Sequence, residues 1–194
     1  MMKYYIDITL LPGPEIPLYF LWEKVYQQLH LAFVENQEEG KIRVGVAFPK
    51  YDKEKLHLGN KLRLLATDSE ILRKLNLDMA LARLVDYVHI TQIREVPEKI
   101  DGYAFFKRIQ LKSSNERLIR RRAKRQGISY EQAASYFEGR KENYSIAPFI
   151  HIKSHSTGKR YRLIIEREDT VIASSEAVFS TYGLSNRSTV PLFQ

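Results

Sequence analysis

Apolar and polar positions in the first third of the chain follow two periods, which predict a strand followed by a helix. Residues 3–9 alternate around Ile6 and Ile8, as in a half-buried strand. Residues 16–36 instead carry apolar side chains three and four positions apart. This spacing predicts a long helix whose buried face holds Leu18, Leu21, Trp22, Val25, Leu29, Ala32 and Phe33.

Three more strands and a second helix complete the first half, with strands expected at residues 42–48, 61–67 and 87–93. Asp68 is suited to cap a helix that we expect to break near Asn76. The order strand, helix, strand, strand, helix, strand predicts a ferredoxin-like domain over residues 1–95. This topology serves many functions and selects none of them.

A strand and a strongly basic helix are predicted next in the chain. Residues 104–111 alternate as a strand, with Arg108 and Gln110 on one side. A helix is expected over about residues 114–126, because Ser113 and Glu116 have capping-box spacing and Gly127 is suited to end it. One face of this helix is apolar, and the other carries Arg117, Arg120, Arg121, Lys124 and Arg125, whereas Arg122 falls on the apolar side.

The remaining residues predict a short helix from Ser129 to about Phe137 and strands at 149–153, 160–166 and 177–181. Small hydroxyl side chains, a glycine and flanking cations in the loop at 154–159 suit contact with a phosphate, although the same residues form ordinary hairpin turns. The fold class expected for the whole chain is α+β. Residues 96–194 are expected to form a second, C-terminal domain.

Charge and composition narrow the possible functions. Of the formal net charge of +8, much is local, since six basic residues lie between Arg117 and Arg125. The absence of cysteine excludes disulfides, structural thiolate zinc sites and cysteine nucleophiles. No stretch reaches the roughly 20 apolar residues of a membrane span, and no signal peptide is evident, so a cytoplasmic protein is expected.

The basic helix favours nucleic-acid binding. Glu116 is the only acidic residue within 113–127, so intrahelical ion pairs cannot balance the cationic face. A polyanion would relieve the repulsion and release counterions. A solvated surface helix and a binder of double-stranded DNA are the alternatives. Arg108 and Gln110 add to the case, because Arg pairs with guanine edges and Gln with adenine edges.

One catalytic route is open to a chain with these side chains. The 2′-hydroxyl of RNA can attack the adjacent phosphate, which requires a base near neutral pKa and nearby cations but no metal. His30 lies at the margin of the apolar face of the first helix, near Tyr26, where a base could be partly accessible. A satisfied core histidine is the alternative interpretation. No metal site and no cofactor are expected.

Motifs spread over nearly the whole chain resemble the type I-F CRISPR-associated endoribonucleases, which process CRISPR transcripts into guide RNAs. Their order and spacing carry the resemblance. They are Leu29-His30, Val44–Pro49, Arg108-Ile109-Gln110, Lys112–Arg125, Ser154–Gly158, Arg160–Leu163 and Tyr182–Ser185.

The resemblance implies an enzyme that binds a CRISPR repeat stem-loop, cleaves at the 3′ base of the stem and stays bound to the product. It implies a general base at His30, a nucleophile-positioning serine at Ser154 and an imidazole-orienting Tyr182. The RNA-binding residues that it implies are Arg108, Gln110, Lys112, Asn115, Arg117, Arg120, Arg121, Lys124, Arg125, Ser156 and Tyr161. The expected partners are the repeat hairpin and other type I-F complex subunits, with a monomer when free; a non-cleaving hairpin-binding subunit is the alternative.

Three positions depart from the family pattern. Tyr161 stands where Phe is expected, and either ring can stack on a base. Lys124 replaces an Arg, which keeps the charge but loses the bidentate fork. Arg122 replaces an apolar residue, so helix packing there is expected to differ.

Overall fold

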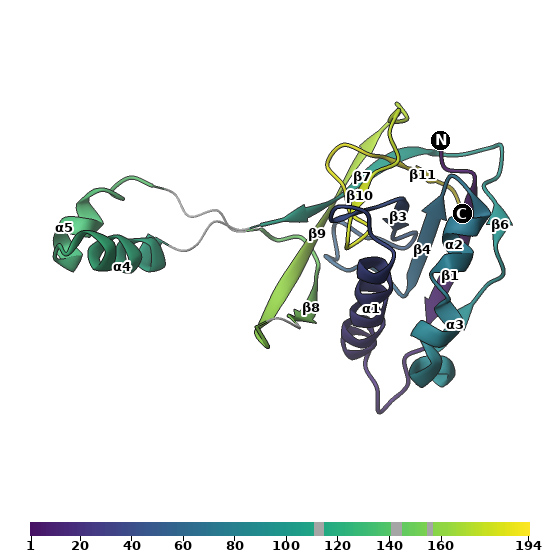
Figure 1. Cartoon of the computed structure of the whole chain (residues 1–194), viewed down its shortest axis with the longest axis horizontal. Coiled ribbons are helices and arrows are strands. Elements are labelled where there is room, and N and C mark those ends of the chain that lie inside the picture. Colours follow the sequence, from purple (N-terminus) through teal and green to yellow (C-terminus); the bar gives the residue numbers. More distant parts are fainter. Residues whose placement is uncertain (111–114, 141–144, 155–156) are drawn as a thin grey trace. The chain divides into compact units, whose positions relative to one another are not determined.

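The computed structural model describes residues 1–110, 115–140, 145–154 and 157–194, and it contains both helices and strands (Figure 1). The expected mixture of α and β structure is therefore confirmed. The helices are α1 (Leu18–Glu35), α2 (Ser69–Lys74), α3 (Leu77–Ala80), the 3-10 helix η1 (Ala82–Tyr87), α4 (Asn115–Gln126) and α5 (Tyr130–Ser135). The strands are β1 (Tyr4–Leu10), β2 (Lys41–Ile42), β3 (Val44–Ala47), β4 (Lys61–Ala66), β5 (Val88–Ile90), β6 (Arg94–Glu95), β7 (Gly102–Ile109), β8 (Phe149–Lys153), β9 (Arg160–Thr170), β10 (Phe179–Ser180) and β11 (Val190–Leu192).

A central sheet has the strand order β3-β4-β1-β5, and β6 also pairs with β1. All of these neighbours are antiparallel. Helix α1 buries the predicted apolar face, including Val25 and Leu29, in one core with sheet residues such as Ile8 and Leu62. Leu18, at the first turn, is only partly buried.

Local signals around the second helix were read correctly. The Asp68 carboxylate accepts a hydrogen bond from the Glu70 backbone N–H at 2.9 Å and so caps α2. Asn76 has a φ of 44° and separates α2 from α3. The strand predicted at 87–93 is shorter, Val88–Ile90, because Tyr87 ends the 3-10 helix η1 that the periodicity did not reveal.

A second sheet has the order β11-β7-β9-β8 and combines strands from widely separated parts of the chain. Strand β10 pairs with β2 of the first half, with Phe179 opposite Ile42. Contacts accordingly divide the chain into one compact unit of Met1–Arg108 with Ala147–Gln194, and a second of Ile109–Ile146. This grouping differs from the sequence halves 1–95 and 96–194, because the C-terminal strands pack on the first half.

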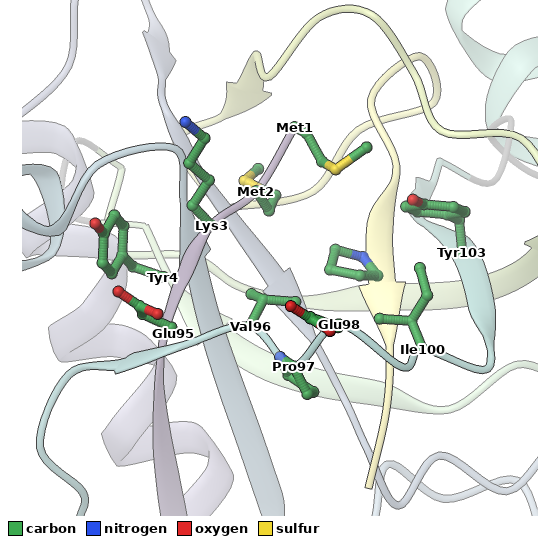
Figure 2. Close-up of a pocket in the computed structure, with 11 residues that line it drawn as sticks. Met1, Met2, Lys3, Tyr4, Glu95, Val96, Pro97, Glu98, Ile100 and Tyr103 are labelled. Atoms are coloured by element: carbon green, nitrogen blue, oxygen red, sulfur yellow. The ribbon is translucent and has the colours of Figure 1, made fainter.

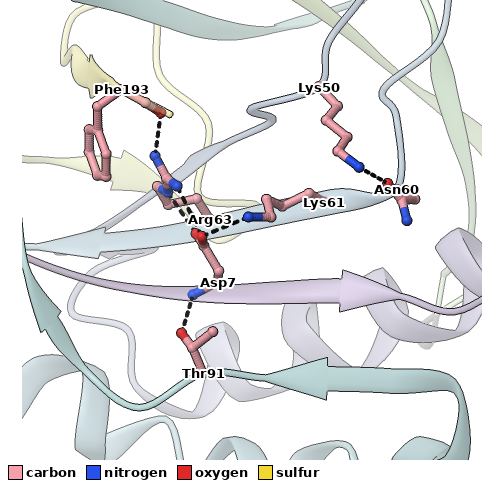
Figure 3. Close-up of polar contacts among 7 residues, drawn as sticks. All are labelled: Asp7, Lys50, Asn60, Lys61, Arg63, Thr91 and Phe193. Atoms are coloured by element: carbon pink, nitrogen blue, oxygen red, sulfur yellow. Dashed lines mark hydrogen bonds and ion pairs between the residues drawn. The ribbon is translucent and has the colours of Figure 1, made fainter. Parts of the chain in front are cut away.

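A buried ion pair fixes the C-terminal end of the chain to the central sheet (Figure 3). The Arg63 Nε donates to Asp7 Oδ1 at 2.6 Å, and its Nη1 donates to the Phe193 carbonyl at 2.7 Å. Burial alone raises the pKa of Asp7, but hydrogen bonds and charge from Arg63 and Lys61 outweigh it and lower that pKa. The Arg63 guanidinium also lies 3.8 Å from the centre of the Phe193 ring.

The second compact unit consists of α4, α5 and their connections. Gly127 has a φ of 64°, as expected for a residue that closes a helix, and Ser129 forms a capping box with Gln132. Arg122 places its guanidinium 3.7 Å from the Tyr136 ring centre, which explains a cation on the apolar side of α4. The predicted capping residue Ser113 lies outside the described residues.

Candidate active site

His30 lies in the C-terminal half of α1 and is partly buried. Its Nδ1 lies 2.7 Å from the backbone carbonyl oxygen of Thr181. A carbonyl can only accept, so this hydrogen bond requires a proton on Nδ1. In the neutral ring Nε2 is then the basic nitrogen, so this contact selects the tautomer that a general base acting through Nε2 requires.

Tyr182 fixes the plane of the imidazole. Its ring stacks on His30 with 4.3 Å between ring centres and an interplanar angle of 6°. The buried Tyr26 hydroxyl donates to the Tyr182 carbonyl at 2.8 Å, so α1 holds two consecutive carbonyls of the same turn. Burial raises the pKa of the Tyr26 hydroxyl, which therefore acts as a neutral donor.

The turn that carries Tyr182 depends on Gly183. Its φ is 70°, and a Cβ there would lie 2.2 Å from Val46 Cγ2. The Val46 backbone N–H donates to the Gly183 carbonyl at 2.8 Å, which attaches the turn to β3. Only glycine meets both the backbone and the space requirements.

Tyr161 and Arg108 extend this cluster. The hydroxyls of Tyr161 and Tyr182 are 2.5 Å apart. Burial, followed by the hydrogen bond to Tyr182, raises the pKa of Tyr161, so the Tyr161 hydroxyl remains neutral near pH 7. The Arg108 guanidinium lies 4.9 Å from the Tyr182 ring centre and 5.6 Å from that of Tyr161. A cation is thus held beside both tyrosine rings.

Ser154 begins the turn between β8 and β9. Its backbone N–H donates to the Lys159 carbonyl at 2.9 Å, and its Oγ accepts from the Thr157 N–H at 3.3 Å. The serine therefore has the turn-forming role that composition allowed, with its hydroxyl at the turn. Lys153, the preceding residue, donates its backbone N–H to Gln27 Oε1 at 3.0 Å, which places the start of this turn against α1. Ser156 lies outside the described residues.

The structure brings His30, Tyr182, Tyr161 and Arg108 into one network, within the same compact unit as Ser154. The other described candidates belong to the second unit; they are Gln110, Asn115, Arg117, Arg120, Arg121, Lys124 and Arg125. Lys112 lies outside the described residues. Strand β7 ends at Ile109 rather than at residue 111, so the expected alternation of Arg108 and Gln110 along one strand is wrong. Gln110 follows the strand and is exposed.

On α4 the predicted cationic face is exposed along the helix, at Arg117, Arg120, Arg121, Lys124 and Arg125. Ile119 on the other side is buried. Arg120 pairs with Glu116, one turn earlier. Asn115 donates its side-chain N–H to the Arg140 carbonyl at 2.8 Å, so it also ties the start of α4 to the segment after α5.

Sequence patterns missed Thr181 and Gln27. Thr181 contributes only a carbonyl, which any residue could supply, and Gln27 is one of many polar residues on α1. Tyr26 was noted only as a neighbour of His30 in phase. No periodicity reports a contact between residues 151 positions apart.

A separate hollow lies at the edge of the central sheet (Figure 2). It has a volume of about 480 Å³ and is lined by Met1, Met2, Lys3, Tyr4, Glu95, Val96, Pro97, Glu98, Ile100, Tyr103 and Pro191. No predicted site residue lines it. Within the described ranges, no three His, Asp or Glu side chains gather where they could hold a metal ion, and no helix is long and apolar enough to cross a membrane.

Comparisons with known proteins agree with the motifs. The sequence model of a family described as "CRISPR-associated protein (Cas_Csy4)" matches residues 5–193. The chain is 34% identical over 192 residues to a CRISPR-associated endonuclease Cas6/Csy4 of Pseudomonas aeruginosa strain UCBPP-PA14, covering 99% of this chain and 100% of that protein. It is 31% identical over 192 residues, with the same coverage, to a CRISPR-associated endonuclease Cas6/Csy4 of Escherichia coli strain UTI89. The resemblance found in the motifs is confirmed, and the chain belongs to the Csy4 family of CRISPR-associated proteins.

Proposed function

We propose that this protein is an endoribonuclease that cleaves CRISPR repeat RNA to make guide RNA. The observation that carries the proposal is the hydrogen bond from His30 Nδ1 to the Thr181 carbonyl, with Tyr182 stacked on the ring. It leaves Nε2 as the basic nitrogen of an imidazole whose plane is fixed. Family membership supports the same reaction class, since both named relatives are CRISPR-associated endonucleases.

The proposed reaction is transesterification within the RNA. His30 Nε2 removes the proton of the 2′-hydroxyl at the cut site, and that oxygen attacks the adjacent phosphorus. The bond to the 5′-oxygen breaks and this oxygen gains a proton, from water or from a side chain, so that the products are a 2′,3′-cyclic phosphate and a 5′-hydroxyl. Ser154 holds the ribose, Tyr182 orients the imidazole, and no metal takes part in the steps.

RNA binding is assigned to the basic helix and to residues near the active site. The cations of α4 contact phosphates in the major groove of a stem-loop, which must be short because the groove of a long A-form duplex is too deep and narrow. Arg108 and Gln110 read bases near the foot of the stem, and Tyr161 stacks on a base. The remaining assigned contacts are those of Lys112, Asn115, Arg117, Arg120, Arg121, Lys124, Arg125 and Ser156.

The proposal includes a division of labour along the chain. Residues 1–95 form a ferredoxin-like domain that supplies His30, supported by the antiparallel strand order β3-β4-β1-β5 and the helices that connect its strands. Residues 96–194 form the C-terminal RNA-binding domain, whose basic helix is α4. Cutting occurs at the 3′ base of the stem.

The free protein is proposed to be a cytoplasmic monomer. After cleavage it stays bound to its product and joins other type I-F CRISPR proteins. Product retention predicts close to one turnover per enzyme molecule. Many turnovers by one enzyme molecule would contradict it.

Cleavage of the cognate repeat RNA in EDTA tests the proposed reaction. A matched RNA with one 2′-deoxy sugar at the cut site serves as the control. The expected result is a cyclic phosphate product from the first RNA and none from the second, with equal binding of both. Tight binding without cleavage of either RNA would instead identify a non-cleaving hairpin-binding subunit.

A further inference from the structure

Helix α1 contacts three separate C-terminal segments through one row of side chains, at Glu23, Gln27 and His30. These positions are four and three residues apart and therefore lie along one side of the helix. Glu23 pairs with Arg160 at the start of β9, Gln27 accepts from Lys153 at the end of β8, and His30 contacts the Thr181 carbonyl. The same row thus contacts both segments that carry the proposed catalytic residues Ser154 and Tyr182.

Gln27 contacts the backbone of an edge strand. Strand β8 lies at the end of the order β11-β7-β9-β8, so one of its edges is not paired within that sheet. The Lys153 N–H reaches Gln27 Oε1 at 3.0 Å, while the next residue, Ser154, donates its N–H to the Lys159 carbonyl at 2.9 Å. Consecutive N–H groups are held by α1 and by the turn, which fixes the backbone from which the Ser154 hydroxyl projects.

The other half of the Gln27 amide has no stabilising partner. Its Nε2 is buried and makes no hydrogen bond to any group in the described part of the chain. A buried, unpaired N–H lowers stability, and an apolar side chain of similar shape would avoid this cost. Folding stability alone therefore does not account for a glutamine at position 27. The hydrogen bond from the Lys153 N–H to Gln27 Oε1 instead indicates that the side chain positions the end of β8.

We propose that Gln27 is a positioning residue for RNA cleavage, which holds the Ser154 turn in register with His30 through the Lys153 N–H. This inference rests on the proposed function, because it assigns Gln27 to the active site of that reaction. Gln27 touches no reacting atom in it. Losing the bond lets the Ser154 backbone shift relative to the imidazole, and small shifts of positioning groups slow chemistry more than they weaken binding.

The test compares Gln27→Met with Gln28→Met in single-turnover cleavage of the repeat RNA. Gln28 is the adjacent glutamine on α1 and is partly buried like Gln27, so its replacement controls for helix and shape effects. Gln27→Met removes Oε1 and is expected to slow cleavage by roughly tenfold, with RNA affinity within about twofold of wild type. Gln27→Glu keeps an acceptor for Lys153 and is expected to recover most of the rate.

A double-mutant cycle with Ser154→Ala asks whether Gln27 acts through the serine. The expected result is that Gln27→Met slows the Ser154→Ala enzyme by less than about twofold, since the group it positions is already gone. Additive effects would overturn the inference, as would equal rates for Gln27→Met and wild type or an equal loss in Gln28→Met. If wild-type protein itself leaves the RNA whole, the proposed function fails and not merely the role of Gln27.

Discussion

The two compact units build their candidate surfaces in opposite ways. In the first unit, His30 contacts a residue 151 positions away, and Tyr26 contacts one 156 positions away. In the second unit, the cations of α4 follow one another along a single helix, stabilised by Arg122 on Tyr136 and by the buried Ile119 and Ala133. A general base needs a defined tautomer and a fixed ring plane, which long-range contacts supply at His30. Attraction of a polyanion requires only that several cations be exposed together, as on α4.

Removal of the proposed base, His30, is expected to have the largest effect of the substitutions considered. His30→Ala should lower the single-turnover cleavage rate by about 10³-fold, because a general base typically contributes about 10² to 10⁴. RNA affinity should stay within about twofold, since α4 is unchanged. Cleavage and equilibrium binding measured on the same RNA check both parts, with the exposed His89→Ala as matched control. A parallel fall in affinity would mean that His30 also contributes to RNA binding.

Asp7 tests how far the first unit depends on buried polar contacts. Asp7→Asn leaves the buried Arg63 without its carboxylate and should lower the free energy of unfolding at pH 7 by about 3 kcal/mol. Because folding lowers the Asp7 pKa from its ordinary value of 3.8, the wild-type advantage is present above that pH and is lost as pH falls further below it. Urea unfolding of both proteins at pH 7 and pH 3 measures the difference, which should narrow at the lower pH.

Alanine substitutions at two glycines with positive φ, one in each unit, allow the effects on stability and cleavage to be compared. At Gly183 a Cβ would meet Val46 Cγ2 at 2.2 Å, whereas at Gly127 it would meet no described atom within 4 Å apart from its chain neighbours. Gly183→Ala should cost about 2 kcal/mol or more in unfolding free energy and slow cleavage, because the clash moves the turn that holds Tyr182. Gly127→Ala should cost about 1 kcal/mol from backbone strain alone and leave the cleavage rate of bound RNA unchanged. Thermal unfolding and single-turnover assays of the pair give both values.

Removal of cations from α4 tests whether the second unit binds RNA through phosphate contacts. Arg121→Ala combined with Lys124→Ala should reduce the slope of log affinity against log salt by about two, at about one unit per lost phosphate contact. The cleavage rate at saturating protein should not change. Titrations at several salt concentrations measure the slope, and Arg83→Ala, an exposed cation on η1, is the control. An unchanged slope would show that α4 is a solvated surface helix.

Tyr161→Phe is expected to have the smallest effect among the substitutions that slow cleavage. It keeps the aromatic ring and removes only the hydroxyl that lies 2.5 Å from that of Tyr182. Cleavage should slow by about threefold, as expected for one lost neutral hydrogen bond behind the imidazole, and affinity should be kept because stacking survives. A loss of affinity without a change in rate would assign Tyr161 to RNA binding alone.

Sequence patterns predicted best what local chemistry decides. The cap at Asp68, the break at Asn76 and the closing Gly127 each depend on a few neighbouring residues, and each was found where expected. The length of α1 was predicted within two residues at each end, since its apolar spacing is regular.

Patterns failed where the decisive partner is remote in sequence or is a backbone atom. A charged pair such as Asp7 and Arg63 resembles any solvated pair until β1 and β4 bring the two side chains together in the interior. The resemblance pointed to His30 and Tyr182 as site residues. The tautomer of His30, however, is set by the Thr181 carbonyl, and the stacking of Tyr182 on the imidazole depends on the turn at Gly183, neither of which a motif reveals. Arg122 departs from the apolar pattern of its side of α4, and the sequence did not reveal that its guanidinium packs over the Tyr136 ring.

The distance in sequence between His30 and its partners has a consequence during protein synthesis. His30 is synthesised 151 residues before Thr181, whose carbonyl sets the proton on the imidazole, and Tyr182, which fixes the plane of the ring, follows directly. The carbonyl of Phe193, which receives a hydrogen bond from Arg63, emerges later still. A nascent chain that has not yet reached this turn therefore carries an unformed candidate active site, and its proposed nuclease activity begins only after the turn has emerged and packed on α1.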